Sequence, residues 1–438
     1  MAWRLLAWVG SVTMLVGCSG LPDLSDLTSL FSPAATPVPT PVVTPTPSPS
    51  PTPAETETPS TGGVTLEFWV PDFLNPHDPQ TGAEILNEQV RAFANINAGI
   101  RVRTSVKKES GAGGLYDLMS TASEVAPSIM PDVLVLNSRD LKTAAQEGLV
   151  QPIDAYMPDD AGYFPSALAA VQTEEALWAF PYVAKADQMA YRQGVTTTAP
   201  LSWTTVVSAN YTLLFPAAPA EGLASDSLLS IYIGSGGRVV DQAGQASLDR
   251  ATLELVYGFF LAMQDAGLLD AELALTLPNA SACWDRFQEG QGGFTPVPVT
   301  RFWQTRPEDA LPSWPPTAEG TRTTILHTWG LAIVTQDPVR RDAAVELVRW
   351  LVSAQHMAEL SLATELVPTR TSAVDAWPVS PEDAAFVKSL LSSSTAALPA
   401  SVDASVRRAL QAGLTVLLES EVETPAEAAS YALTNLRR

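Results

Sequence analysis

The chain has 438 residues and a formal net charge of −22, with 47 acidic residues against 25 Lys and Arg. Such an acidic surface repels nucleic acid and anionic membranes, so we expect neither a nucleic-acid partner nor direct binding to a membrane surface. The only cysteines are Cys18 and Cys283, and the three histidines have no metal-ligand spacing, so we expect no metal site and no cofactor.

The chain begins with an apolar run, Leu5–Gly17, that ends at Cys18. A transmembrane helix needs about 20 apolar residues, whereas the apolar part of a signal peptide needs about 7–15. Leu15-Val16-Gly17-Cys18 resembles the lipobox of bacterial lipoprotein signal peptides. The resemblance implies that residues 1–17 are removed and that Cys18 carries acyl chains such as palmitate. An ordinary secretory peptide and a short membrane anchor are the alternatives.

Residues 18–63 predict a disordered tether. From Pro33 to Thr61, proline alternates with Thr and Ser, and each proline fixes φ and removes an amide donor. Such a tract is an extended, semi-rigid spacer at about 3.1 Å per residue, so it reaches up to roughly 90 Å. A proline-rich ligand for a partner domain is the alternative.

The remaining part, Val64–Arg438, is longer than the roughly 250–300 residues at which one hydrophobic core usually divides, so we expect two lobes. Val64–Val70 is β-branched and aromatic and predicts a first strand. Helical spacing of apolar residues predicts a helix over 83–95, and alternation predicts a strand over 100–106. Asp132–Asn137 is almost wholly apolar, as in a strand buried on both faces.

This succession of strands and helices predicts an α/β fold with right-handed crossovers. Later in the chain, apolar residues at steps of three and four predict long helices over 249–266, 341–362 and 402–420.

Ten short passages, in this order, resemble the extracellular solute-binding proteins of bacterial ABC importers, specifically the carbohydrate (maltose-type) family 1. Together they make a match that extends over essentially all of Val64–Arg438. The passages are Leu66–Trp69, Phe93–Val102, Met130–Val135, Gly148–Ile153, Ala179–Tyr182 with Tyr191, Pro200–Trp203, Gly236–Val239, Phe287–Gly290, Trp329–Ile333 and Pro368–Arg370.

The resemblance implies the two-lobed periplasmic-binding-protein (type II) fold, which closes about a hinge on a ligand between the lobes. Carried onto this chain, residues 64–183 with 328–370 form lobe 1, and residues 184–327 with 371–438 form lobe 2. The chain is expected to cross between the lobes near 182–187, 327–330 and 367–372.

Candidate ligand-binding residues in lobe 1 follow two strands. Trp69 ends the first strand and Asp72 follows it; an indole face suits a sugar ring and a carboxylate accepts hydroxyl hydrogen bonds. Asn137, Ser138 and Arg139 follow the buried strand, at the end where open α/β sheets bind ligands. Core packing is the alternative for Trp69, and capping of a helix is the alternative for Asn137 and Ser138.

The expected hinge contributes Tyr182, Lys185 and Asp187. Maltose-type relatives often have a carboxylate at the position of Lys185, so this chain departs from the family there. Lys185 either binds an acidic sugar or pairs with Asp187 or Asp72, and pairing is the interpretation that we favour.

In lobe 2, Asp226 and a group of aromatic residues are the candidates. Trp284, Phe294, Trp303 and Trp314 lie within about thirty residues, a density typical of carbohydrate platforms but also of a core. We take Trp284, Trp303 and Trp329 as ligand-binding candidates.

The resemblance implies a lipid-anchored, monomeric receptor outside the cytoplasm that binds a sugar or oligosaccharide and delivers it to permease subunits. Its work would be binding and not catalysis, since no nucleophile elbow, phosphate loop or convincing carboxylate pair is present. A surface glycan adhesin or sensor, and the same fold binding a polyamine or another solute, are the alternatives.

Overall fold

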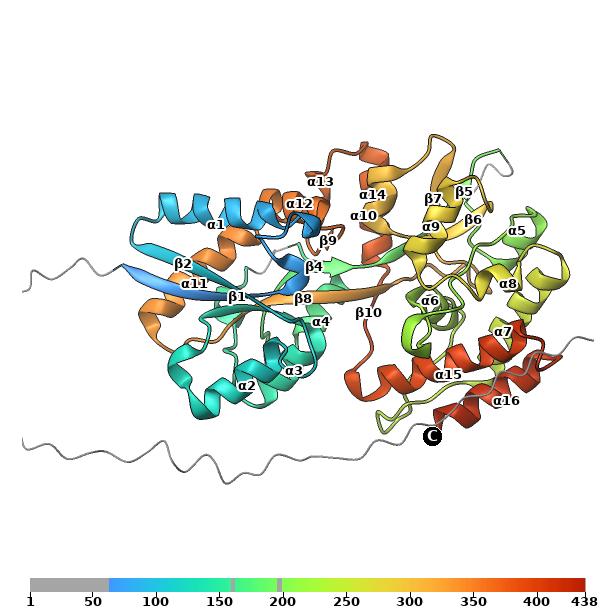
Figure 1. Cartoon of the computed structure of the whole chain (residues 1–438), viewed down its shortest axis with the longest axis horizontal. Helices are drawn as coiled ribbons and strands as arrows, with labels where there is room; N and C mark the ends of the chain where they lie inside the picture. Colours follow the sequence, from blue (N-terminus) through green and yellow to red (C-terminus); the bar gives the residue numbers. More distant parts are fainter. Residues whose placement is uncertain (1–62, 159–161, 195–198, 438) are drawn as a thin grey trace, which may run out of the picture. The chain divides into compact units, whose positions relative to one another are not determined.

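The computed structural model describes residues 63–158, 162–194 and 199–437 (Figure 1). The predicted signal peptide, the Cys18 lipidation site and the tether up to residue 62 lie outside these residues. Among the helices that are described, none is both long and apolar enough to cross a membrane.

The first sheet has seven strands in a mixed arrangement. Strand β1 pairs in parallel with β2 and β3, whereas β8 runs antiparallel to β3 and β4. The order is β2-β1-β3-β8-β4-β9, with β10 beside β8. The strands are β1 (Val64–Pro71), β2 (Ile100–Lys107), β3 (Val133–Asn137), β4 (Phe180–Lys185), β8 (Ile325–Ile333), β9 (Val367–Pro368) and β10 (Thr395–Ala396).

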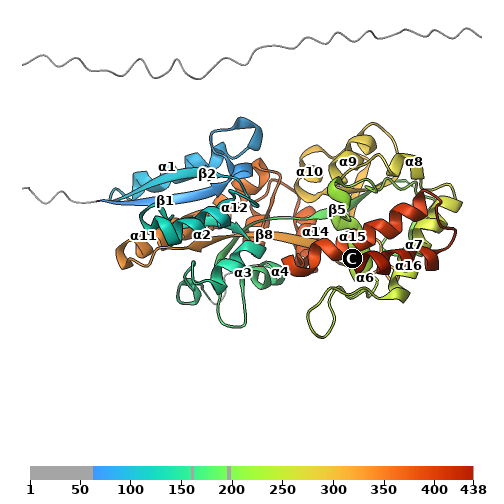
Figure 2. The same cartoon turned by 60° about the horizontal axis from the view of Figure 1, so that its bottom comes forward.

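Helices cover both faces of this sheet and together with it form the first lobe (Figures 1 and 2). They are α1 (Glu84–Ile96), α2 (Leu115–Val125), α3 (Ser138–Gln146), α4 (Pro165–Val171), α11 (Pro338–Leu351), α12 (Ala354–Ala363), α13 (Thr371–Asp375) and α14 (Pro381–Ser392). Residues Val133–Leu136 of β3 are fully buried, as their apolar sequence predicts.

The single helix predicted over 341–362 is wrong, because two helices occupy this region. The break lies at Ser353, whose hydroxyl accepts a hydrogen bond from the backbone N–H of His356 and caps α12. Serine at an N-cap satisfies an amide that would otherwise lack a partner, so it starts a new helix even within a helical apolar pattern.

The second lobe has a three-stranded sheet in the order β6-β5-β7 and its own hydrophobic core. The strands are β5 (Asp187–Arg192), β6 (Phe294–Pro298) and β7 (Ala310–Ser313). The helices are α5 (Trp203–Ser208), α6 (Asp226–Gly234), α7 (Arg250–Asp265), α8 (Ala271–Ala274), α9 (Ala280–Gln288), α10 (Val299–Thr305), α15 (Ala400–Leu418) and α16 (Pro425–Leu436). The long helices α7, α15 and α16 pack together and hold most of this core (Figure 1).

The chain passes between the two lobes at three places. Two of them, from β4 to β5 and along β8, lie where the sequence predicts them. The third lies at Thr395–Leu398 and not at 367–372, because apolar residues of α13 and α14, such as Val374 and Leu390, are buried in the core of the first lobe. The exact division of the chain into lobes stays a proposal, and this packing favours a boundary near residue 394.

Candidate functional site

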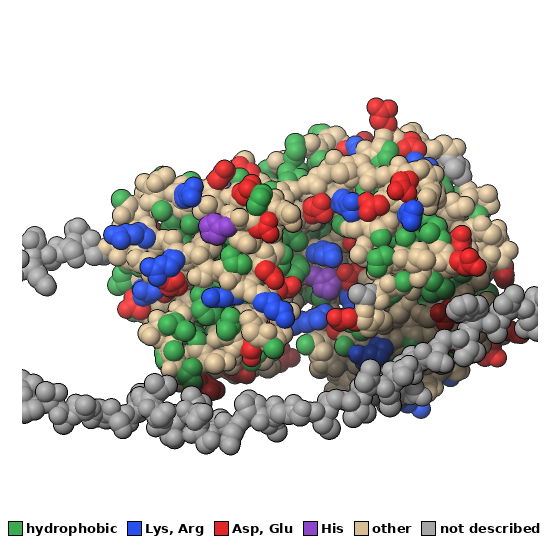
Figure 3. All heavy atoms as spheres, viewed as in Figure 1, with side chains coloured by type: hydrophobic (Ala, Val, Ile, Leu, Met, Phe, Trp, Pro, Cys, Tyr) green, Lys and Arg blue, Asp and Glu red, His purple; other side chains and the backbone are tan. Residues whose placement is uncertain are grey.

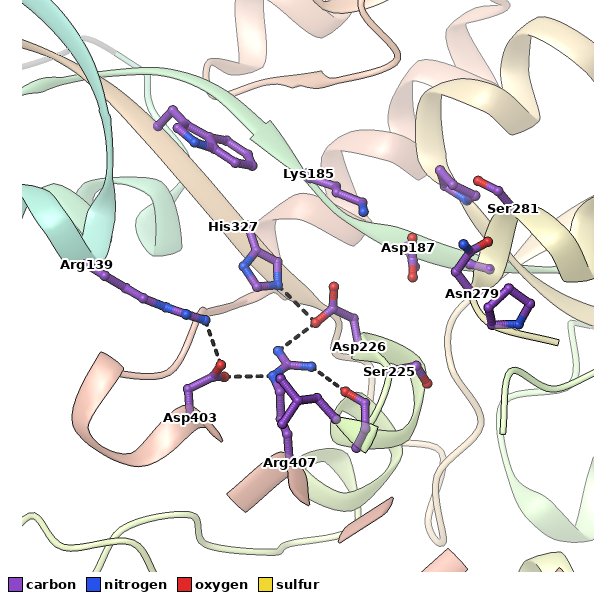
Figure 4. A pocket seen from close by; sticks show the side chains of 16 residues that line it. Arg139, Lys185, Asp187, Ser225, Asp226, Asn279, Ser281, His327, Asp403 and Arg407 are labelled. Carbon is purple, nitrogen blue, oxygen red and sulfur yellow. Dashed lines mark hydrogen bonds and ion pairs between the residues drawn. The ribbon is translucent and has the colours of Figure 1, made fainter. Parts of the chain in front are cut away.

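A chamber of about 500 Å³ lies between the two lobes and is lined by residues of both. We call it the larger chamber (Figure 4). On the surface, histidine and basic side chains lie in a hollow between the two halves of the molecule (Figure 3). The lining residues are Arg139, Lys185, Asp187, Leu223, Ala224, Ser225, Asp226, Pro278, Asn279, Ala280, Ser281, Pro298, His327, Trp329, Asp403 and Arg407.

Five charged or titratable side chains form one continuous chain of contacts along a wall of this chamber (Figure 4). We call it the cleft network. Arg139 Nη2 lies 2.7 Å from Asp403 Oδ2, and Asp403 Oδ1 accepts a 2.7 Å hydrogen bond from Arg407 Nε. Arg407 Nη2 also donates to Asp226 Oδ1 at 2.7 Å, and His327 Nε2 lies 2.9 Å from the same oxygen. The network therefore joins α3 and β8 to α6 and α15.

Local sequence places each member of the network. The Asn137 side chain accepts hydrogen bonds from the backbone of Arg139 and Asp140, so it caps α3 and fixes the start of that helix at the chamber. The Ser225 hydroxyl caps α6 in the same way and puts Asp226 in its first turn. Asp403 and Arg407 are four residues apart on α15, a spacing at which side chains of a helix meet.

Asp226 is the best-compensated carboxylate of the site. Burial alone would raise its pKa, but the charges of His327 and Arg407 and the hydrogen bond with His327 hold the pKa well below its usual value. Asp226 is therefore ionised at neutral pH. The carboxylates of Asp226 and Asp403 raise the pKa of Arg407 in spite of its burial, so Arg407 and Asp226 both stay charged.

Asp187 and Lys185 differ from the network, because each keeps unused hydrogen-bonding capacity. Asp187 is only 7% exposed, and its Oδ1 atom has no partner among the described residues. Burial raises the pKa of Asp187 to about 6, against the opposing charge of Lys185. Within the described part of the chain, Lys185 forms no ion pair, so the pairing with Asp187 or Asp72 that we favoured from sequence is not made.

A second, smaller chamber of about 300 Å³ adjoins the first. The two share Arg139, His327 and Trp329 in their linings. The orientation of Trp329 is fixed, because its indole N–H donates to Glu109 at 2.9 Å and its ring contacts Phe73 edge-on at 5.0 Å. The smaller chamber is lined by Glu109, Ser110, Asn137, Ser138, Arg139, Asp140, His327, Thr328, Trp329, Ala397 and Ala400.

Seven of the residues predicted from sequence line these chambers. The larger chamber contains Arg139, Lys185, Asp187, Asp226 and Trp329, and the smaller one adds Asn137 and Ser138. Asn137 also caps α3, so the capping role that we left open from sequence is present.

The other five predicted residues line neither chamber. Tyr182 and Trp284 are fully buried and offer no surface to a ligand; Trp284 stacks on Phe287 in a small core of the second lobe. Trp69 is 6% exposed in the core of the first lobe. Asp72 is exposed, and Trp303 packs against Phe302 and the Arg306 guanidinium.

Sequence reasoning missed several lining residues, above all His327, Asp403 and Arg407. One signal pointed to the last two: an Asp and an Arg four residues apart lie among the buried apolar residues of α15, such as Val402 and Val406. A charged pair on the apolar side of a helix must be compensated in the fold, which marks it as part of a polar site. No comparable signal marks His327.

Comparison with known proteins agrees with this fold. Residues 88–388 match the model of the family described as bacterial extracellular solute-binding proteins. No match was found among curated proteins.

Solved structures with the same fold align with this chain over nearly the whole of their own length. A family 1 extracellular solute-binding protein from Alicyclobacillus acidocaldarius superposes with a TM-score of 0.66 at 15% identity, covering 86% of this chain and 99% of that one. A cyclic alpha-maltosyl-1,6-maltose binding protein from Arthrobacter globiformis gives 0.65 at 15% identity, with 86% and 98% covered. The sugar-binding protein MalE from Xanthomonas citri gives 0.65 at 18% identity, with 85% and 97% covered.

Replacing Arg407 by alanine tests the energetic role of the cleft network. The substitution leaves Asp403 without its partner on α15 and Asp226 with His327 alone, and breaking a buried ion pair from one side costs about 3–5 kcal/mol. We expect a loss of this size in the free energy of unfolding, measured by urea denaturation. Arg238→Ala removes an exposed ion pair of the same lobe and is the matched control, for which no measurable change is expected. Equal effects of the two substitutions would contradict a special role for the network.

Proposed function

The chain belongs to the bacterial extracellular solute-binding proteins, and from this we propose that it is a receptor that binds a polyhydroxylated solute, a sugar or oligosaccharide, in the larger chamber. The family implies a location outside the cytoplasm. The single observation that carries the choice of solute is the charge balance of the larger chamber.

Three cationic side chains, Arg139, Lys185 and Arg407, face three carboxylates in the larger chamber. Four of these six side chains, Arg139, Asp403, Arg407 and Asp226, form ion pairs with one another in the cleft network. A strongly charged solute, such as a polyamine or a polyphosphate, would have to displace these ion pairs. A neutral ring with hydroxyl groups does not, so the lining favours hydroxyls over charges.

The groups left unused suit hydroxyl recognition. The Asp187 carboxylate accepts hydrogen bonds and the Lys185 ammonium donates them, and a sugar hydroxyl does both. Asn279 and Ser281, at the start of α9, add further polar groups to the same chamber. Trp329, whose indole N–H is held by Glu109, offers a fixed aromatic surface for the apolar face of a ring. The sugar-binding relatives of the same fold support the same class of solute.

The two-lobed architecture also suits a role in transport. A ligand that contacts residues of both lobes favours the closed arrangement, and a membrane partner can recognise that arrangement. We propose that the partner is a pair of ABC permease subunits, and that acyl chains on Cys18 with the tether of residues 18–63 keep the receptor close to them. Tethering raises the local concentration of the receptor at its partner without any new contact.

A thermal-unfolding screen of the purified full-length chain tests the proposed solute class. At 100 times its dissociation constant, a ligand stabilises the native state by about 2.7 kcal/mol. We expect cellobiose, maltose or a related sugar to raise the melting temperature, and spermidine and ATP to leave it unchanged.

The shift with sugar should shrink in Trp329→Ala and persist in Trp178→Ala, which removes an indole of the first lobe that lines neither chamber. A melting temperature raised by spermidine alone, or by none of these compounds, would overturn the proposal.

The pKa of Asp187 gives a second prediction. Hydrogen bonds from sugar hydroxyls favour the ionised carboxylate of Asp187, so the receptor binds sugar weakly when Asp187 is protonated. Since the pKa of Asp187 is about 6, only a minor fraction is ionised at pH 5, and the affinity for sugar should be about tenfold lower there than at pH 7. Calorimetric titrations at the two pH values measure the difference. Asp187→Asn should bind weakly at both, and a variant that keeps the full pH step would show that another group is responsible.

A further inference from the structure

The smaller chamber contains two carboxylates that form no ion pair among the described residues. Glu109 and Asp140 line it, and neither has an ion-pair partner within 4 Å among the described residues. The two basic side chains of the lining are already engaged elsewhere. Arg139 pairs with Asp403, and His327 contacts Asp226 in the larger chamber.

The environment of these carboxylates makes their charge unfavourable. Burial raises the pKa of Glu109, and the charges of Asp72 and Asp140 raise it further, against the hydrogen bond from Trp329 and the charge of His327. Burial also raises the pKa of Asp140, although the hydrogen bond from Asn137 and the charge of Arg139 oppose the shift. A cation placed between the two carboxylates would relieve both effects.

Two further features point to a ligand in this chamber. The Thr328 side chain is only 2% exposed, and its hydroxyl has no hydrogen-bond partner among the described residues. Trp329 presents aromatic surface to the same lining, and an ammonium group close to an indole face is attracted to it. Because Trp329 and His327 line both chambers, one solute can extend from the larger into the smaller.

We propose that the smaller chamber binds an ammonium group, so that the solute is an amino-substituted oligosaccharide with one unit in each chamber. The proposal rests on the proposed function, since it names the class of sugar that the same cleft receives. Glu109 and Asp140 accept hydrogen bonds from the ammonium group, and such charge-assisted bonds are stronger than those to a neutral hydroxyl.

A metal ion and a linear polyamine fit the site less well. Among the described residues, no cluster of three or more His, Cys, Asp or Glu side chains could hold a metal ion. A polyamine would also extend a second ammonium group toward Lys185, which lies unpaired in the larger chamber. The arrangement therefore suits one cationic substituent on an otherwise neutral, hydroxylated solute.

Three disaccharides test the proposal on the full-length chain. Glucosaminyl-β-1,4-glucose, its N-acetyl form and cellobiose share one β-1,4-linked backbone and differ only in the substituent at carbon 2 of the non-reducing ring, which is an amine, an acetamide or a hydroxyl. By isothermal titration calorimetry at pH 7, we expect the amine form to bind at least about tenfold more tightly than the other two. Equal or weaker binding of the amine form overturns this inference and leaves the proposed function standing. No binding of any of the three, with no other sugar active in the thermal screen, overturns both.

A variant that removes one negative charge tests whether the ammonium group lies at Glu109. Glu109→Gln keeps an oxygen that can accept the hydrogen bond from the Trp329 indole but loses the negative charge. The preference for the amine form over cellobiose should fall to about threefold or less.

Glu124→Gln removes one charge from an exposed position of the same lobe and is the matched control, which should keep the full preference. If the wild-type preference survives in Glu109→Gln, the ammonium group does not lie at this carboxylate and the assignment fails.

Discussion

The rest of the site depends on the compensation of one buried carboxylate. Asp226 lies at the start of α6 between the two lobes, where an unpaired charge would cost several kcal/mol. It is stabilised there because Arg407 approaches from α15 and His327 from β8. Three segments that are distant in the sequence are thus held together by one side chain, and Arg139 extends the same network into the first lobe through Asp403.

Because these charges are paired with one another, only certain other side chains remain free to bind a ligand. Charges that are already paired form the wall of the larger chamber, and a solute meets them as a fixed polar surface. Asp187 and Lys185 keep unused polar atoms in the larger chamber, and Glu109 and Asp140 line the smaller chamber without an ion pair among the described residues. These groups support the proposal that the larger chamber binds hydroxyl groups and the smaller one a cation, without moving the network.

The sequence predicted the framework better than the site. The apolar strand at 133–136 and the long helix at α15 follow from periodicity, and the polar residues after β3 do line the cleft because strand ends face the crevice. Trp284 and Tyr182 line neither chamber and are buried in cores, which the sequence does not show because composition does not tell which way a side chain points. His327 was missed because its role depends on Asp226, which is 101 residues away in the chain.

A crystal structure of the full-length chain with bound cellobiose would show whether the solute lies between the lobes on the wall built by the cleft network. We expect a disaccharide with hydroxyl groups within hydrogen-bond distance of Asp187 and Lys185, one ring against Trp329, and unbroken contacts among Asp226, Arg407 and His327. A disaccharide bound away from these residues, or one that replaces the ion pairs of Asp226 with its own hydroxyls, would contradict it.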